Sequence, residues 1–133
     1  MAHNPWRARM YLSGNTAITT DTAIPFNTVD YDPNGNLTTG VGAHYTVPVN
    51  GLYLITGSVQ DSAGSAAFLA IIGKNTVTGV QFGSYATNSI STVTGILSLV
   101  AGDTITLIVE GANFTATGVS AATNIAICFL APT

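Results

Sequence analysis

The chain has 133 residues, a mass of 13.6 kDa and a net charge of −3 from three basic and six acidic side chains. Three cations cannot neutralise a track of phosphates, which argues against nucleic acid and against a polybasic membrane contact. No apolar run approaches the roughly eighteen residues of a membrane-spanning helix, and residues 1–10 lack the apolar stretch of a signal peptide. Charged residues make up only 7% of the chain, and a surface so poor in charge usually needs a partner.

Short β-branched and aromatic runs predict an all-β, antiparallel sandwich in a single domain over residues 1–133. No window sustains helical spacing of apolar residues. Turns are expected at residues 32–35, 50–51 and 101–103, where Pro, Asn, Asp and Gly gather. The predicted strands, in chain order, are Arg7–Leu12, Thr22–Phe26, Gly40–Val47, Gly51–Gln60, Phe68–Gly73, Val80–Tyr85, Ser91–Leu99, Thr104–Glu110 and Asn124–Leu130.

The predicted strands differ in how many of their faces are apolar. Thr104–Glu110 alternates, which predicts one dry face and one wet face, with Ile108 as the exception. Residues 52–55 and 125–130 are apolar on both faces, so we expect them to be neighbours in one sheet and to line an oligomer axis. A loop that covers them is the alternative. The predicted interface residues are Leu52, Leu54, Ile125, Ile127 and Phe129.

A spaced set of aromatic, acidic and glycine positions lies between residues 26 and 53: Phe26, Asp32, Leu37, Tyr45, Gly51 and Tyr53. The set resembles the signature of the complement C-one-q-like globular head, a branch of the tumour-necrosis-factor-like jelly rolls. That family usually has Phe where this chain has Tyr45, and the gap before this position is one residue longer here. Residues 99–105 and 127–130 resemble the family's penultimate and last strands.

The resemblance implies a jelly roll of about ten antiparallel strands that assembles as a compact homotrimer. It also implies that the first strand, the last strand and the strand after Gly51 lie in the inner sheet, near the threefold axis. Such trimers bind partners or build structures and are not enzymes, and their loops cluster at the ends where partners dock.

One segment matches part of a calcium site. Asp30, Asp32, Asn34 and Gly35 have the spacing of the first half of an EF-hand loop, but Val41 stands where a bidentate glutamate is needed. A hairpin turn with Asx capping is the favoured interpretation. A weak calcium site that involves Asp103 or Asp61, as the resemblance would allow, is the alternative, and no metal site is predicted.

Nothing in the sequence predicts an enzyme or a cofactor. There is no nucleophile elbow, and Cys128 lies within an apolar strand, where a buried, inert thiol is expected. His3 and His44 have no second ligand or acid at useful spacing.

The N-terminal segment gathers Trp6, Arg7 and Arg9, side-chain types that often anchor interfaces. Residues 1–10 are therefore interpreted as an arm that docks on another protein. The alternative is that they begin the first strand, with Trp6 packed on the base of the sandwich.

The leading hypothesis is a virion structural protein, made in a host cytoplasm. It would be a trimeric bacteriophage decoration or cement protein that clamps major capsid proteins through multivalent contacts. The alternative is a receptor- or carbohydrate-binding head of a tail fibre or spore surface, with a glycan as partner. Its ligand loop would comprise Phe82, Tyr85, Asn113 and Phe114, although aromatics at this spacing are more often core residues. A cytokine-like ligand is a third hypothesis.

Overall fold

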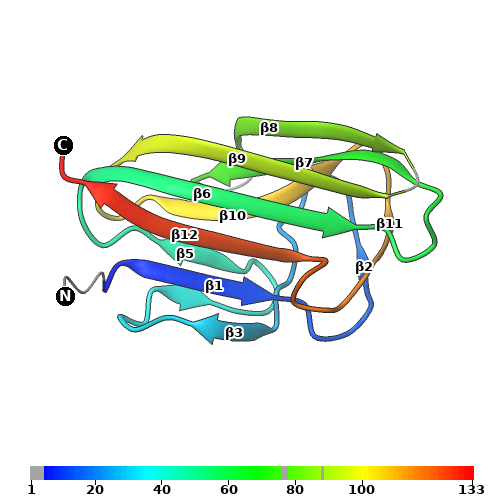
Figure 1. The fold of residues 1–133 in the computed structure, drawn as a ribbon, viewed down its shortest axis with the longest axis horizontal. Coiled ribbons are helices and arrows are strands. Elements are labelled where there is room, and N and C mark those ends of the chain that lie inside the picture. The colour runs from blue at the N-terminus through cyan, green and yellow to red at the C-terminus, as the bar shows by residue number, and fades with distance from the viewer. Residues whose placement is uncertain (1–4, 76–77, 88) are drawn as a thin grey trace.

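Two five-stranded antiparallel sheets face each other across one apolar core (Figure 1). The computed structural model describes residues 5–75, 78–87 and 89–133. The strands are β1 (Arg7–Tyr11), β2 (Thr16–Ile18), β3 (Thr28–Tyr31), β4 (Leu37–Thr38), β5 (His44–Thr46), β6 (Gly51–Gln60), β7 (Ala67–Lys74), β8 (Thr78–Thr87), β9 (Ile90–Leu99), β10 (Thr104–Glu110), β11 (Phe114–Ala116) and β12 (Asn124–Ala131).

The front sheet, which is nearest the viewer in Figure 1, has the order β3-β1-β12-β6-β9. The rear sheet has the order β4-β5-β10-β7-β8, and β11 pairs with β2 in a small third sheet. The predicted all-β antiparallel sandwich is therefore confirmed, and so is the predicted pairing of residues 52–55 with the last strand. In the described part of the chain, no helix is long and apolar enough to span a membrane.

The core is built by strands whose side chains alternate between inside and outside. Along β6 the buried positions are every second residue, and Tyr53, Ile55 and Val59 are fully buried. Burying an aliphatic side chain of this size contributes about 1.5–3 kcal/mol relative to leaving it exposed. Gly57 has the same inward orientation, and a Cβ there would lie 2.6 Å from Leu107 Cδ1 on the opposite sheet. The Leu107 side chain therefore fills the space that a side chain at residue 57 would occupy.

β8 and β9 are edge strands of the rear and front sheets, and their backbones are in direct contact. A Cβ placed on Gly83 would collide with the carbonyl oxygen of Thr92 and would lie 2.9 Å from the carbonyl oxygen of Ala70. Only glycine fits there, because backbone atoms cannot move aside as a flexible side chain can. We call this contact the Gly83 seam.

The long strands lie where they were predicted, and the short ones were missed. β6 and β10 have the predicted bounds, and the bounds of β1, β7, β8, β9 and β12 differ by one or two residues. The predicted strand Gly40–Val47 shortens to β5, whereas β2, β3, β4 and β11 were not predicted.

The predicted strand Thr22–Phe26 is wrong. This segment makes only an isolated bridge, between Ala23 and Ile108 of β10. A continuous ladder is prevented because Asp21 has a left-handed φ of 61° and Pro25 has no N–H to donate.

The prediction of a wet outer face on β10 is wrong in the middle of the strand, although Thr104 is partly exposed and Glu110 is exposed. Thr106 and Ile108 point away from the core, yet they are only 5% and 3% exposed. Ile108 lies between Ile71, its partner on β7, and Ala23, its bridge partner. The segment around Ala23 thus extends the rear sheet at the point where β5 ends.

Candidate functional site

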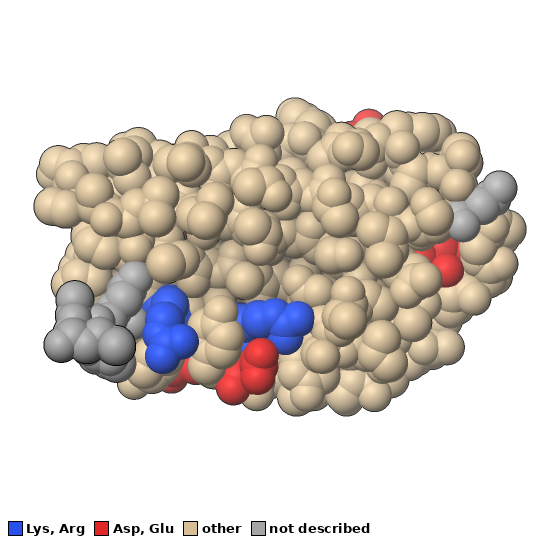
Figure 2. Space-filling model, in the orientation of Figure 1, with Lys and Arg blue, Asp and Glu red and all other residues tan. Residues whose placement is uncertain are grey.

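The outer surface of the front sheet is almost free of charge. Figure 2 shows it as mainly uncharged atoms, with the blue side chains and a red group beside them along the lower edge, over β1 and β3. Strand register defines its composition, because residues paired across β12, β6 and β9 alternate between core and solvent together. We call the outward residues of these three strands the front face: Leu52, Leu54, Thr56, Ser58, Thr92, Thr94, Ile96, Ser98, Asn124, Ala126, Cys128 and Leu130.

The front face changes from apolar to polar along the strands. At one end, Cys128 pairs with Leu54, and Leu54 pairs with Ile96, which gives an apolar row across the sheet. Two residues further along, the corresponding row is Ala126, Thr56 and Thr94.

The apolar end of the front face is open to solvent in the single chain. Ile96 is 61% exposed and Leu130 is 47% exposed. A shallow hollow of about 70 Å³ lies beside them, lined by Tyr31, Leu54, Thr56, Ala126, Ile127 and Cys128. Exposed apolar area that is contiguous and bordered by uncharged groups is typical of a protein–protein contact.

The structure divides the predicted interface residues into two groups. Leu52 and Leu54 point outward on the front face. Ile125 and Ile127 point inward and are 0% and 1% exposed, so their assignment to the interface is wrong. In a run that is apolar at every position, the residue types do not show which alternate side chains face outward. The outward residues Cys128 and Leu130 were missed for the same reason, and Ile96 was missed because it lies outside the two segments that are apolar on both faces.

Phe129 is partly buried and packs against the core of the single chain. Its ring makes edge contacts with Trp6 and Tyr53, at centroid distances of 5.0 and 5.4 Å. The backbone N–H of Phe129 donates to the Trp6 carbonyl at 3.0 Å. Trp6 therefore packs on the end of the sandwich, as the alternative interpretation of the N-terminal segment expected.

The part of the predicted docking arm from Arg7 onward belongs to the front sheet, so residues 7–10 are not a separate arm. Arg7 lies over the ring of Tyr31 at 5.0 Å. Arg9 forms an ion pair with Asp30 at 3.0 Å and donates to the Ser120 carbonyl. Residues 1–4 lie outside the described part of the chain. Of the two arginines, Arg7 is the more exposed and lies beside the front face.

Two of the predicted ligand-loop residues are exposed aromatic side chains, and the other two make contacts with other residues of this chain. Phe82 and Tyr85 lie on β8, at the edge of the rear sheet, and are 58% and 64% exposed. Phe114 packs against Phe68 with a centroid distance of 4.3 Å. Asn113 Oδ1 accepts a hydrogen bond from the Thr20 N–H at 2.8 Å. Phe82 and Tyr85 remain as an exposed aromatic pair.

The calcium half-motif is a turn. Both carboxylate oxygens of Asp32 accept backbone N–H groups, from Asn36 and Leu37, at 2.9 Å each. Gly35 has a φ of 70°, and its N–H donates to the Asp32 carbonyl. The oxygens that a cation would need are therefore engaged by the loop itself, and the favoured interpretation of an Asx-capped turn fits this geometry.

The carboxylates of Asp61 and Asp103 also accept backbone N–H groups. Asp61 accepts the N–H groups of Ala63, Ser65 and Ala66. Burial acts to raise the pKa of its carboxyl, but these backbone hydrogen bonds outweigh it and lower the pKa below the ordinary 3.8. In residues 5–75, 78–87 and 89–133, no group of three or more His, Cys, Asp or Glu side chains could hold a metal ion.

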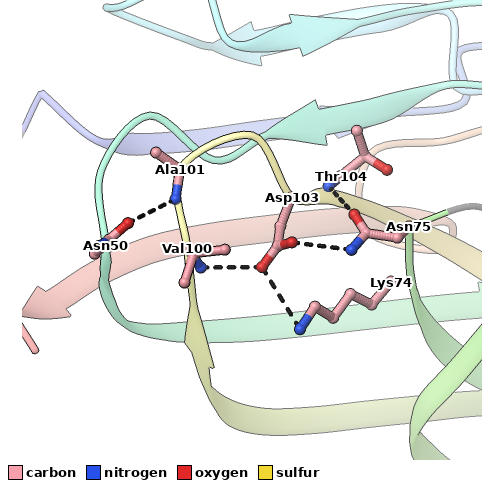
Figure 3. Close-up of polar contacts among 7 residues, drawn as sticks. All are labelled: Asn50, Lys74, Asn75, Val100, Ala101, Asp103 and Thr104. Carbon is pink, nitrogen blue, oxygen red and sulfur yellow. Dashed lines mark hydrogen bonds and ion pairs between the residues drawn. The ribbon is translucent and has the colours of Figure 1, made fainter.

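Asp103 joins two turns at one end of the sandwich (Figure 3). Its carboxylate accepts the Val100 N–H and the Asn75 Nδ2–H, both at 2.9 Å, and Lys74 Nζ lies 3.5 Å away. Burial acts to raise the pKa of Asp103, but these partners together lower it. Asn75 Oδ1 accepts the Thr104 N–H, which completes the link between the two turns.

The structure describes the cysteine and one of the two histidines. Cys128 is only half-buried, contrary to the prediction, because it faces outward from β12. The Nδ1 atom of His44 lies 2.8 Å from the Gly42 carbonyl. His3 lies outside the described residues.

No family model matches this sequence, and no curated protein matches it. Solved structures do match its fold. The Eiger tumour necrosis factor of S. frugiperda superposes with a TM-score of 0.78 at 14% identity, covering 98% of this chain and 96% of that one. Murine APRIL superposes with a TM-score of 0.72 at 14% identity, covering 93% of this chain and 98% of that one. The globular domain of zebrafish complement 1qA gives 0.71 at 10% identity, covering 96% and 98%. The chain therefore has the jelly-roll fold shared by tumour necrosis factors and complement C-one-q globular heads.

Proposed function

We propose that this protein is a non-enzymatic module that assembles into a closed homotrimer through its front face. The single observation that carries this proposal is the apolar, nearly uncharged end of that face, open to solvent around Leu54, Ile96 and Leu130. Removing such area from water contributes about 25 cal/mol per Å². Only 7% of the residues are charged, so few charges need to be desolvated when copies associate.

A ring of three copies needs two different contact surfaces on each copy. In a cyclic trimer the contact is heterologous, because the patch on one subunit meets another patch on the next. The front face therefore needs a partner surface elsewhere on the chain. The exposed pair Phe82 and Tyr85 on the edge strand β8 supplies one, because aromatic side chains contribute large buried areas at interface centres.

We further propose that the trimer binds a larger particle, with a viral shell as the platform and major capsid protein as the partner. Two features of the chain support this role: the scarcity of charge and the exposed Arg7, which lies over Tyr31 beside the front face. Three copies of one contact would engage several capsid subunits at once, and multivalency would raise the cost of separating them.

The assembly is tested with two variants that each damage one surface. Leu54→Glu places a charge on the front face, and Phe82→Glu places one on the β8 edge. Each variant alone is expected to give a monomer by light scattering, whereas the wild type gives a trimer. A 1:1 mixture should give a heterodimer, because the intact edge of one variant fits the intact face of the other but the ring cannot close.

Other outcomes of this mixing experiment contradict the ring. If the wild type is a monomer, the proposal fails. If Phe82→Glu remains fully assembled while Leu54→Glu does not, the contact joins two front faces and the closed ring is wrong. Circular dichroism of each variant shows whether the sandwich is intact.

The particle role is tested separately by sedimentation of the trimer with isolated empty capsids. Saturable binding that Arg7→Ala weakens, with the trimer intact, supports it. Binding to a glycan array without binding to capsids would instead favour the receptor-binding alternative.

A further inference from the structure

A cavity on the rear sheet lies where two segments that border β10 diverge. β5 pairs with β10 only at Thr104 and Ile105. Beyond that point the segment around Ala23 takes over, since the Ile24 N–H donates to the Leu107 carbonyl at 2.8 Å. Between the two segments lies an opening of about 680 Å³, within the range of about 300–1,000 Å³ that is typical of small-molecule sites.

The cavity is lined by outward side chains whose chain neighbours point into the core. Ala23 and Pro25 line it, whereas Ile24 and Phe26 are core residues. His44 lines it in the same way from β5. The complete lining is Ala17, Ile18, Thr19, Asp21, Thr22, Ala23, Pro25, Val41, Gly42, His44 and Thr106. This arrangement gives a mainly apolar wall with a few polar groups.

Beside the threonine hydroxyls, which can donate or accept, two side chains of the lining offer acceptor atoms: Asp21 and His44. The carboxylate of Asp21 has no hydrogen-bond or ion-pair partner among the described residues, although its backbone N–H donates to the Val109 carbonyl. His44 Nδ1 faces the Gly42 carbonyl at 2.8 Å and must carry a proton to donate to it. In the neutral ring this leaves Nε2 as an acceptor. The Thr22 hydroxyl is already committed as a donor to the Thr19 carbonyl at 2.7 Å.

We propose that this cavity binds a small organic ammonium ion with an apolar body. The ammonium group would supply the N–H donors and the positive charge that Asp21 and His44 Nε2 lack, while the apolar body would lie against the aliphatic lining. The net charge of −3 favours the approach of a cation over that of an anion.

The backbone at Asp21 allows the carboxylate to be removed without disturbing the fold. Its φ of 61° lies in the left-handed region, which Asn adopts as readily as Asp and which Gly adopts without strain. Asp21→Asn therefore removes the charge and keeps the conformation, and Asp21→Gly serves as the second variant. Glu110→Gln is the matched control, because it removes the same charge from an exposed neighbouring strand end that does not line the cavity.

The test is a chemical-shift titration of the full chain with benzylammonium, benzyl alcohol and ammonium chloride. Benzylammonium should give saturable shifts centred on residues 17–25 and 41–44. Asp21→Asn and Asp21→Gly should each weaken it about fivefold, which corresponds to the upper range of an exposed ion pair, and Glu110→Gln should leave it unchanged. Benzyl alcohol and ammonium chloride should each bind more weakly than benzylammonium.

Three results would overturn the proposal. The first is the absence of saturable shifts at the cavity. The second is equal binding of benzylammonium by the wild type and both Asp21 variants. The third is equal binding of benzyl alcohol and benzylammonium, which would show an apolar pocket without a preference for cations. None of these results bears on the trimer, because the cavity is lined neither by Phe82 or Tyr85 nor by any residue of the front face.

Discussion

The outward apolar side chains of the two sheets are covered in one case and exposed in the other. On the rear sheet, Thr106 and Ile108 of β10 point outward, yet the chain itself covers them with neighbouring segments. On the front sheet, Leu54 and Ile96 also point outward, and the single chain leaves them uncovered. Equal hydrophobicity on a strand can therefore be satisfied within one chain or left for a partner. The difference is visible only once the neighbouring segments are placed.

The largest expected effect separates the two faces directly. Leu54→Glu should abolish assembly, because it would bury an unpaired charge between copies. Val41→Glu, at a residue that is 99% exposed at the rim of the rear cavity, should leave assembly unchanged. Size-exclusion chromatography with light scattering measures both. A monomeric Val41→Glu protein would show that the rim of the rear cavity also takes part in assembly.

The next effect separates the inner and outer sides of one strand. Ile127→Ala should lower the free energy of unfolding by about 3 kcal/mol, because Ile127 is a buried core residue and its truncation leaves a cavity. Cys128→Ser, one residue later, should change the stability of the isolated chain by less than about 1 kcal/mol, since it faces outward. Chemical denaturation measures both variants in the Leu54→Glu background. An equal loss of stability in the two variants would contradict the inward orientation of Ile127 and the outward orientation of Cys128.

Acid should act on the ends of the sandwich rather than on its faces. The pKa values of Asp61 and Asp103 are lowered in the folded chain below the ordinary 3.8. Their contribution is therefore complete above the unfolded pKa and is lost as pH falls through 3.8 towards the folded values. Asp61→Asn should cost about 2 kcal/mol at neutral pH, because an amide nitrogen cannot accept the loop N–H groups.

The Asp61→Asn cost should shrink as pH falls through 3.8, because the wild-type carboxyl then takes up a proton first in the unfolded chain, which favours unfolding. Urea denaturation above and below that pH measures the change. A cost that is independent of pH would show that the Asp61 charge does not stabilise the loop.

The smallest expected effect is an increase in the free energy of unfolding. The hydroxyl of Tyr45 is buried without a hydrogen-bond partner, and burial raises its pKa. Tyr45→Phe removes this unsatisfied group and should raise the free energy of unfolding by about 1 kcal/mol. Thermal denaturation with Tyr53→Phe as the comparison tests it, because the Tyr53 hydroxyl donates to the Val49 carbonyl at 2.7 Å. A loss on Tyr45→Phe equal to that on Tyr53→Phe would contradict this reading.

The sequence predicted the fold where strands are long enough to show a period. β6 and β10 have their predicted bounds because runs of ten and seven residues, rich in aliphatic and β-branched side chains, follow directly on turn residues. β4 contains two residues and β11 three, so neither can display a period. The pattern around Asp32 also predicted its turn, because the Pro-Asn-Gly chemistry is local.

The candidate sites were only partly predictable because they depend on segments far apart in the chain. Leu54 was identified, but its partner Ile96 follows from the register of β6 and β9, which residue types do not reveal. Asp21 and His44 line the same cavity because β5 pairs with only the first two residues of β10, and the segment around Ala23 contacts the residues that follow. No local sequence pattern predicts that replacement.

The Gly83 seam limits which sequences can adopt this shape. Any side chain at that position would push the backbones of β8 and β9 apart, since the obstructing atoms are the carbonyl oxygens of Thr92 and Ala70. A library randomised at this codon and selected only for solubility should return glycine almost exclusively. Such a result would mark a requirement that acts before any partner or ligand is met.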